Sequence, residues 1–193
     1  MELVARCQSG DRAAFRQLVE QYERTVFNII VSVMGDPTEA DDIAQEVFLK
    51  VYRSLPTFRG GSQFSVWLYR VTVNQCLDWL KRRRRRSAVM SLDQLVDQSE
   101  GDLDFLFKDA SPDATETLDE ARLQQAIHAA LNTLTPDHRV VIVLKDLEGR
   151  SQEEIAAILD CPVGTVKSRL TRAREALKER LRPFYEAWKA GGN

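Results

Sequence analysis

Residues 151–177, with the sequence SQEEIAAILDCPVGTVKSRLTRAREAL, carry the pattern that decides the fold. Ser151 and Glu154 form a predicted capping box, in which each side chain accepts a hydrogen bond from the backbone N–H of the other residue. Apolar residues then recur at helical spacing in two blocks, which a short break at Pro162 separates. Two short helices joined by a tight turn are the helix-turn-helix pattern, whose second helix enters the major groove of DNA.

Hydrogen-bond donors line the outward face of the predicted second helix. Side chains near the start of such a helix reach base edges, and later ones reach phosphates. A solvated basic face on an ordinary helical hairpin is the alternative interpretation, but the cap, the turn and the basic face coincide here. The candidate DNA-binding residues are Thr165, Lys167, Ser168, Thr171, Arg172 and Arg174.

Helical spacing of apolar residues also extends over the N-terminal half of the chain. One apolar stripe covers residues 15–33 and then meets a glycine, where a helix can end. A second helix is predicted to start at a cap formed by Thr38 with Asp41 and to stop at a proline. A third is predicted to run from a Ser62 cap to the basic run at 81–86.

The helical pattern fades over an acidic stretch and then returns. Residues 91–120 contain one basic and ten acidic side chains, whereas residues 1–90 contain 14 basic and 10 acidic, and residues 121–193 contain 12 basic and 9 acidic. After the acidic stretch, Thr135 is a predicted N-cap because a proline follows it. We therefore predict an all-α chain of two small helical domains, joined by an acidic flexible linker at 91–120.

Residues that could support catalysis or bind a metal are sparse. Cys7, Cys76 and Cys161 show neither metal-ligand nor disulfide spacing, which suits a reducing compartment. His128 and His138 have no convergent nucleophile or carboxylate, and the sequence has no glycine-rich phosphate loop. No signal peptide or membrane-spanning run is recognisable. We expect a cytoplasmic protein that is not an enzyme, with no cofactor, no metal, no small-molecule substrate and no membrane insertion.

Both halves of the chain resemble one protein family. EEIAAILDCPVGTVKSRLTRAREAL (153–177) resembles the promoter-reading motif of the extracytoplasmic-function RNA polymerase sigma factors, a group of the sigma-70 family. Three further stretches resemble the first domain of the same family: GDRAAFRQLVEQY (10–22), EADDIAQEVFLKVYRSL (39–55) and FRGGSQFSVWLYRVTVNQCLDWL (58–80). The resemblance implies sigma domain two over 1–90 and sigma domain four, with the helix-turn-helix, over 121–187.

The resemblance also assigns three binding surfaces. The helix-turn-helix donors become the residues that read the −35 element. The second is an exposed helix face that carries a leucine among polar groups, as partner-binding surfaces often do. The resemblance implies that the clamp helices of the beta-prime subunit of core polymerase bind this face, at Asp42, Gln45, Glu46 and Leu49. The resemblance further implies that a loop and the helix after it contact a flipped base of the −10 element and the neighbouring phosphates. The residues concerned are Ser54, Phe58, Arg59, Arg70, Val71 and Asn74.

Three features of the sequence each allow two interpretations. Trp67 lies on the apolar stripe, so core packing is favoured over a role at the fork of the opened duplex. The basic run Lys81–Arg86 is expected to end the third helix and to contact phosphates, with a solvated helix end as the alternative. The acidic linker either mimics RNA inside the polymerase channels or is a solvated tether.

The resemblance implies the function and the partners. The chain is expected to be an alternative sigma factor that directs promoter-specific initiation in an envelope or other stress response. Its expected partners are core RNA polymerase, through the beta-prime and beta subunits, promoter DNA and an anti-sigma factor, which can hold it at the inner membrane face. The alternative is a helix-turn-helix regulator that acts without replacing sigma. The arrangement of the two domains in the free chain stays open.

Overall fold

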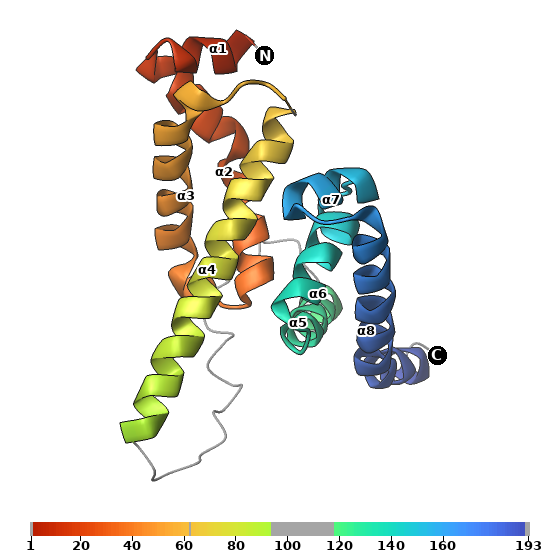
Figure 1. Cartoon of the computed structure of the whole chain (residues 1–193). Coiled ribbons are helices and arrows are strands. Elements are labelled where there is room, and N and C mark those ends of the chain that lie inside the picture. The colour runs from red at the N-terminus through yellow and green to blue at the C-terminus, as the bar shows by residue number, and fades with distance from the viewer. Residues whose placement is uncertain (1, 62, 94–117, 192–193) are drawn as a thin grey trace.

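The computed structural model describes residues 2–61, 63–93 and 118–191, and the regular elements in these ranges are all helical (Figure 1). They form two bundles, as the sequence predicts, while most of the predicted linker lies outside the described residues. The first bundle contains α1 (Glu2–Gln8), α2 (Arg12–Met34), α3 (Ala40–Ser54) and α4 (Phe64–Asp93). The second contains α5 (Leu118–Asn132), α6 (Pro136–Ile142), α7 (Gln152–Leu159) and α8 (Val163–Gly191).

Helix α2 organises the first bundle. The Asp11 side chain accepts hydrogen bonds from the N–H groups of Ala13 and Ala14 and so caps its start. Gly35 ends it in a left-handed conformation with φ 72°. The predicted apolar stripe is confirmed, because one side of α2 is fully buried against α3 and α4, at Leu18, Val26, Ile29, Ile30 and Val33.

The predicted capping of the second helix by Thr38 and Asp41 is wrong. Asp36 is the capping residue: its Oδ1 accepts the Thr38 N–H at 3.0 Å and starts a 3₁₀ turn, η1 (Pro37–Glu39), from which α3 follows with no side-chain cap. Pro37 explains the shift, since its fixed φ suits the first position of a helical turn and leaves the preceding residue as the cap.

The prediction that the basic run 81–86 ends the third helix is also wrong. Helix α4 continues to Asp93, so the cations lie within the helix and do not face its C-terminal dipole. Residues 87–93 contain neither glycine nor proline, and nothing in them stops a helix. The predicted cap, Ser62, lies outside the described residues.

The second bundle confirms the helix-turn-helix. The Ser151 Oγ accepts the Glu154 N–H at 3.0 Å, and the Ser151 N–H donates to the Glu154 Oε2 at 2.7 Å, which completes the capping box. Asp160, with φ 52°, ends α7 in the left-handed region, and the turn at Pro162 leads into α8. The inner faces of the two helices are buried, at Ile155, Ile158, Val166, Leu170 and Ala173.

Two details of the second bundle differ from simple helical periodicity. The Thr135 cap is confirmed, since its Oγ1 accepts the His138 N–H at 3.4 Å, but α6 then widens into a π-turn, η4 (Val143–Leu147). Leu123, which shares the spacing of the buried α5 residues, is 44% exposed. Among the α5 side chains that the structure describes, those near its C-terminal end, Ala130 and Leu131, are buried in the core.

The two bundles touch each other. Helix α7 packs on α4, and α6 and η4 approach α2. On α4, the buried Tyr69 has its hydroxyl 3.4 Å from the Glu148 Oε2, and the Arg150 guanidinium lies 5.0 Å over its ring. The next residue of α4, Arg70, faces Asp160 at 3.5 Å.

A buried arginine of α6 forms hydrogen bonds across this contact. Arg139 is 7% exposed, and burial lowers the pKa of its guanidinium. Its Nη1 donates to the Val33 carbonyl of α2 at 2.9 Å, and its Nη2 donates to the carbonyls of Asn132 at 2.9 Å and Leu134 at 3.3 Å. A cation at the C-terminal carbonyls of a helix is favourable, and a hydrogen bond from a charged donor contributes roughly 1.5–3 kcal/mol.

Gly35 allows the bundles to approach at this point. The Asn132 amide donates to the Gly35 carbonyl at 3.3 Å, and a Cβ on Gly35 would lie 1.8 Å from the Asn132 Oδ1. Together with its positive φ, this close approach requires glycine.

Replacement of Ser151 by alanine tests the capping box. Loss of the hydroxyl leaves the N–H of Glu154 without its acceptor, and we expect the second bundle to lose about 0.5–2 kcal/mol of unfolding free energy in urea. Ser168→Ala is the control, because that hydroxyl bonds only to the Thr165 carbonyl of its own helix. Equal stability of the two variants would contradict the assignment.

Candidate nucleic-acid interface

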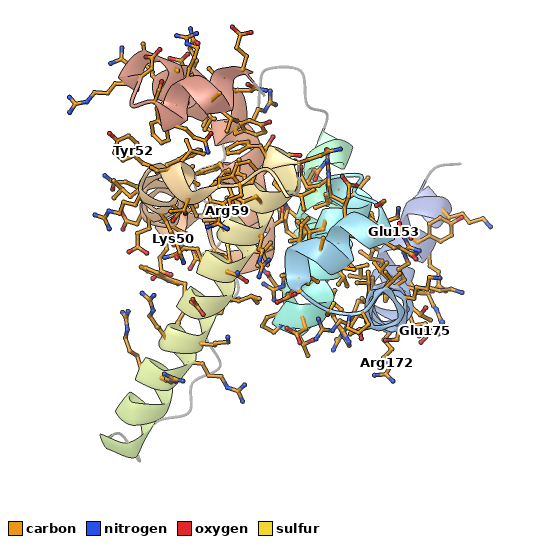
Figure 2. All side chains as sticks on the ribbon, turned by 45° about the horizontal axis from the view of Figure 1, so that its top comes forward. Lys50, Tyr52, Arg59, Glu153, Arg172 and Glu175 are labelled. Carbon is orange, nitrogen blue, oxygen red and sulfur yellow. The ribbon has the colours of Figure 1, made fainter. Side chains whose placement is uncertain are left out.

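The outer face of α8 presents the predicted DNA-reading residues. Thr165 is half-buried, and the next residues of the set are exposed: Lys167, Ser168, Thr171 and Arg172. Figure 2 shows Arg172 projecting from α8 into solvent. This face points away from the first bundle, since α7 lies between α8 and α4. The structure therefore leaves this face of α8 free to enter the major groove of DNA.

Arg174 differs from the rest of the predicted set. Its Nη2 lies 2.6 Å from the Asp146 Oδ1, so its guanidinium turns back toward η4. Arg169 behaves in the same way, with its Nη2 2.9 Å from the Asp137 Oδ2. These two arginines hold α8 against its own bundle, and either would have to exchange its carboxylate for a phosphate to contact DNA.

The predicted −10 residues gather around an aromatic cluster. The Phe58 ring centroid lies 5.1 Å from that of Trp67 and 5.9 Å from that of Phe64. Trp67 packs against the core, as the sequence predicts, while remaining half-buried. On α4 the half-buried Val71 and the exposed Asn74 follow Trp67 by four and seven residues, so they share its face.

The other predicted −10 residues flank this cluster. Ser54 is the half-buried last residue of α3, and Arg59 is exposed on the loop that follows (Figure 2). Arg70 is exposed on α4 but pairs with Asp160 of the second bundle. The fold thus brings the predicted set to one edge of the first bundle, with one of its cations already engaged.

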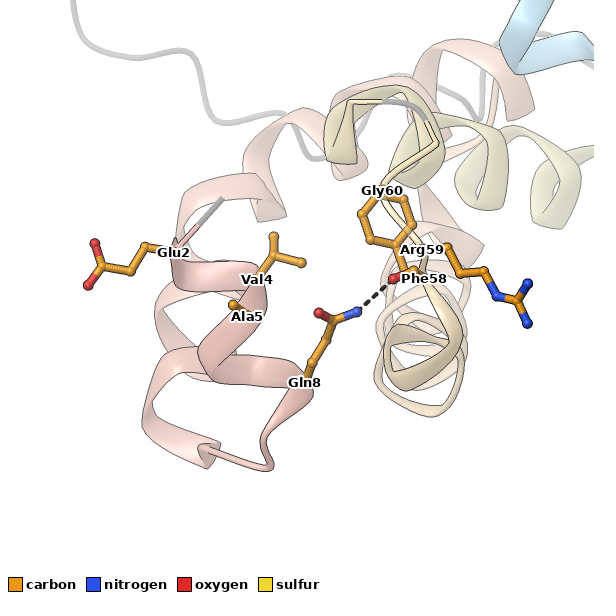
Figure 3. A pocket seen from close by; sticks show the side chains of 7 residues that line it. All are labelled: Glu2, Val4, Ala5, Gln8, Phe58, Arg59 and Gly60. Carbon is orange, nitrogen blue, oxygen red and sulfur yellow. Dashed lines mark hydrogen bonds between the residues drawn. The ribbon is translucent and has the colours of Figure 1, made fainter.

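Helix α1 supplies a residue that the sequence analysis missed. The Gln8 Nε2 donates to the carbonyls of Leu55 at 3.0 Å and Phe58 at 2.7 Å, which fixes the loop that carries the Phe58 ring. Figure 3 shows Gln8 reaching from α1 toward this loop, across a cavity of about 440 Å³ lined also by Val4, Arg59 and Gly60. No local pattern could reveal a contact between residues about fifty positions apart.

An apolar groove runs between α2 and α3. Leu49 and Tyr52 are 46% and 47% exposed, unusual values for such side chains, and Tyr52 packs edge-on against Phe15 with ring centroids 4.9 Å apart. The groove encloses about 540 Å³ and is lined by Arg12, Phe15, Arg16, Val19, Gln45, Phe48, Leu49 and Tyr52. Two of the predicted polymerase-binding residues therefore lie in it. Tyr52 was missed, although it follows Leu49 by one turn on the same side.

The other two predicted polymerase-binding residues have different surroundings. Asp42 is exposed in the first turn of α3. The Glu46 Oε2 accepts a short hydrogen bond from the Nε2 of Gln75, a buried residue of α4. Glu46 therefore also satisfies a buried amide, and Gln45 and Leu49 are the cleaner probes of the exposed surface.

The basic run is exposed along α4. Arg83 also reaches Asp36, with its Nη1 3.4 Å from the Asp36 Oδ2, and Lys81 lies 3.8 Å from Asp78. Within the described ranges, no helix is long and apolar enough to cross a membrane, and no cluster of histidine, cysteine and acidic side chains is arranged to bind a metal. Burial raises the pKa of the Cys76 thiol to about 12, which keeps it protonated.

Comparison with known families matches both bundles. The family model of Sigma-70 region 2 matches residues 18–86, and that of Sigma-70 region 4 matches residues 124–177. The RNA polymerase sigma-H factor of Pseudomonas aeruginosa is 41% identical over 187 residues, covering 95% of this chain and 94% of the relative. The ECF RNA polymerase sigma-E factor of Escherichia coli K12 is 39% identical over 182 residues, with 94% of each chain covered.

Two solved structures superpose over both bundles. The sigma factor RpoE of Bartonella quintana, in complex with the anti-sigma factor NepR, has a TM-score of 0.67 at 28% identity, covering 87% of this chain and 96% of its own. CnrH, in complex with the cytosolic domain of CnrY, has a TM-score of 0.65 at 29% identity, covering 94% and 96%. The chain therefore belongs to the sigma-70 family, as an RNA polymerase sigma factor of the extracytoplasmic-function group.

Proposed function

We propose that this sigma factor binds core polymerase through the α2–α3 groove, opens and reads the −10 element with the Phe58 loop and α4, and reads the −35 element with α8. The observation that carries the proposal is that different elements form these surfaces: α2 and α3 form an apolar groove, the Phe58 loop and α4 form an aromatic edge, and α8 carries an exposed basic face. No catalytic step is assigned to the chain, which acts as a targeting subunit.

The groove suits a helical partner. Exposed Leu49 and Tyr52 offer apolar contact, and Arg12, Arg16 and Gln45 rim it with polar groups. An amphipathic helix that lies in such a groove buries its apolar side and pairs its polar rim. The clamp helices of the beta-prime subunit have this form in the family, and Asp42 and Glu46 extend the same face of α3.

The aromatic edge suits an unstacked base. Phe58 and Trp67 present rings on which a base can stack, and the exposed Asn74 amide can hydrogen-bond the edge of that base. Ser54 and Val71 border the same surface. Arg59, Arg70 and the basic run on α4 offer cations for the flanking phosphates.

The proposal extends to regulation and location. Of the two solved structures that superpose over both bundles, the sigma factor RpoE is in complex with an anti-sigma factor, and CnrH is in complex with the cytosolic domain of CnrY. We propose an anti-sigma partner for this chain as well, and a role in an envelope or other stress response. The protein would act in the cytoplasm, at the inner membrane face where that partner is membrane-bound.

Promoter-specific transcription with bacterial core polymerase tests the proposed function. Transcripts that start at fixed sites only when the full chain is added would establish promoter selection and define both elements. A chain that shifts promoter DNA equally well with and without core polymerase, and yields no transcript, would instead be a helix-turn-helix regulator.

Leu49→Asp tests the groove. A charge in its centre should weaken binding to core polymerase by at least about tenfold, as loss of a central apolar contact does at other interfaces. Binding is measured by fluorescence anisotropy of the labelled full chain. Gln21→Ala, an exposed change on α2 outside the groove, is the control. Core affinity equal to that of the control would contradict the assignment.

Arg172→Ala tests the α8 face. We expect the holoenzyme to bind the promoter more weakly. If the lost contact is to a duplex phosphate, the slope of log binding constant against log salt concentration should become less negative by roughly 0.9. Glu175→Gln, an exposed change one turn further along α8, should not weaken binding. Equal losses for both variants would indicate a change in the helix and not a lost contact.

Gln8→Leu tests the anchoring of the Phe58 loop. Removal of two hydrogen bonds should make promoter opening about tenfold slower while leaving core affinity unchanged. Opening is followed by permanganate reactivity of −10 thymines. Ser9→Ala is the neighbouring control, since its hydroxyl bonds only to the Arg6 carbonyl. Unaltered opening in the Gln8 variant would show that these two hydrogen bonds are not needed to position the Phe58 loop.

A further inference from the structure

Two arginines of α8 lie at the edges of its DNA-reading face. At about 100° per residue, the buried Val166, Leu170 and Ala173 mark the inner side of this helix. Arg169 and Arg174 lie about 70° to either side of that inner direction, and the other members of the predicted reading set lie further round. A helix in the major groove has base edges in front of its outer face and a phosphate strand along each flank. The two arginines are therefore placed toward opposite strands.

Each of these arginines is paired with a carboxylate from another element of the same bundle. The Arg169 Nη2 lies 2.9 Å from the Oδ2 of Asp137, which is in the first turn of α6. Arg174 donates to both carboxylate oxygens of Asp146 in η4, through its Nε at 3.3 Å and its Nη2 at 2.6 Å. Both edges of the reading face are thus bordered by an arginine that already has an acidic partner.

The other cations of the reading face differ in this respect. Lys167 and Arg172 are exposed, and neither has a carboxylate partner in the ranges that the structure describes. Among the cations of residues 163–174, pairing is therefore confined to the two flanks, where the guanidinium would meet a phosphate. A carboxylate at such a place neutralises the cation and adds a negative charge that repels the approaching phosphate.

Both ion pairs are weak enough for DNA to displace them. The side chains of Asp137 and Arg174 are 55% and 53% exposed, and their partners are half-buried. Exposed ion pairs contribute little in water, because solvent screens the charges and two long side chains lose rotamer freedom when they pair. A duplex presents a dense row of phosphates, so a guanidinium beside it can exchange the carboxylate for a phosphate.

We propose that Asp137 and Asp146 restrain DNA binding: each carboxylate holds a flanking arginine of α8, and a duplex must displace that carboxylate before the arginine can reach a phosphate. The inference rests on the proposed function, because it takes α8 as the helix that enters the −35 duplex. Binding to DNA of any sequence depends on phosphate contacts. The restraint therefore weakens backbone binding and leaves the base contacts a larger share of the binding free energy.

Asp146→Asn tests the restraint in the full chain, assembled with core polymerase on a labelled promoter duplex. Loss of the carboxylate charge should tighten promoter binding about threefold, which is the scale of one exposed ion pair. Binding is measured by fluorescence anisotropy. Arg174→Ala should abolish this gain, so the double variant should bind no more tightly than Arg174→Ala alone. Such a double-mutant cycle isolates the coupling between the two residues.

Glu153→Gln is the charge-matched control. Glu153 is exposed on α7 (Figure 2), and it pairs with no arginine in the part of the chain that the structure describes. An equal gain with Glu153→Gln, or a gain from Asp146→Asn that persists beside Arg174→Ala, would indicate general repulsion and overturn the restraint. Weaker binding by Asp146→Asn would overturn it too, because the carboxylate would then orient the arginine for DNA.

The second pair gives an independent test on the opposite flank. Asp137→Asn should tighten binding about threefold, but not when Arg169→Ala is also present. Arg172→Ala in the same assay separates the restraint from the proposed function. If Arg172→Ala binds as tightly as the wild type, α8 does not read the −35 element, and the restraint fails with that assignment. If it binds more weakly while neither carboxylate is coupled to its arginine, the restraint alone is wrong.

Discussion

The buried guanidinium of Arg139 is the constraint on which the arrangement of the molecule depends. It lies between the end of α2 and the turn that joins α5 to α6, and it donates to carbonyls on both sides. A buried cation is stable only where such acceptors surround it. Within the described residues no carboxylate pairs with it, so it loses the Val33 carbonyl when the bundles part. The stability of the second bundle and the position of the first are therefore coupled through one side chain.

Because the two bundles are in contact, the three proposed binding surfaces are not equally accessible to polymerase and DNA. The α2–α3 groove and the outer face of α8 lie away from the contact between the bundles and are exposed. The −10 edge is partly engaged, because Arg70 and Tyr69 of α4 face the second bundle.

Local patterns predicted much of the fold, and long-range contacts account for the rest. The stripe of α2, the caps at Ser151 and Thr135 and the helix-turn-helix follow from spacing within one or two turns. The capping role of Asp36 was missed because Pro37 shifts the start of the turn. Gln8 and Arg139 could not be predicted, since their partners are distant in sequence and lie on other elements.

Single-molecule energy transfer between dyes at positions 50 and 175 tests the contact between the two bundles most directly. Lys50 on α3 and Glu175 on α8 are exposed and lie in different bundles (Figure 2). The dyes are attached to cysteines in a Cys161→Ser background, where the remaining thiols, Cys7 and Cys76, are buried. We predict one high-transfer population for the free chain, because α7 of the second bundle packs on α4 of the first. Low transfer in the free chain would contradict this contact.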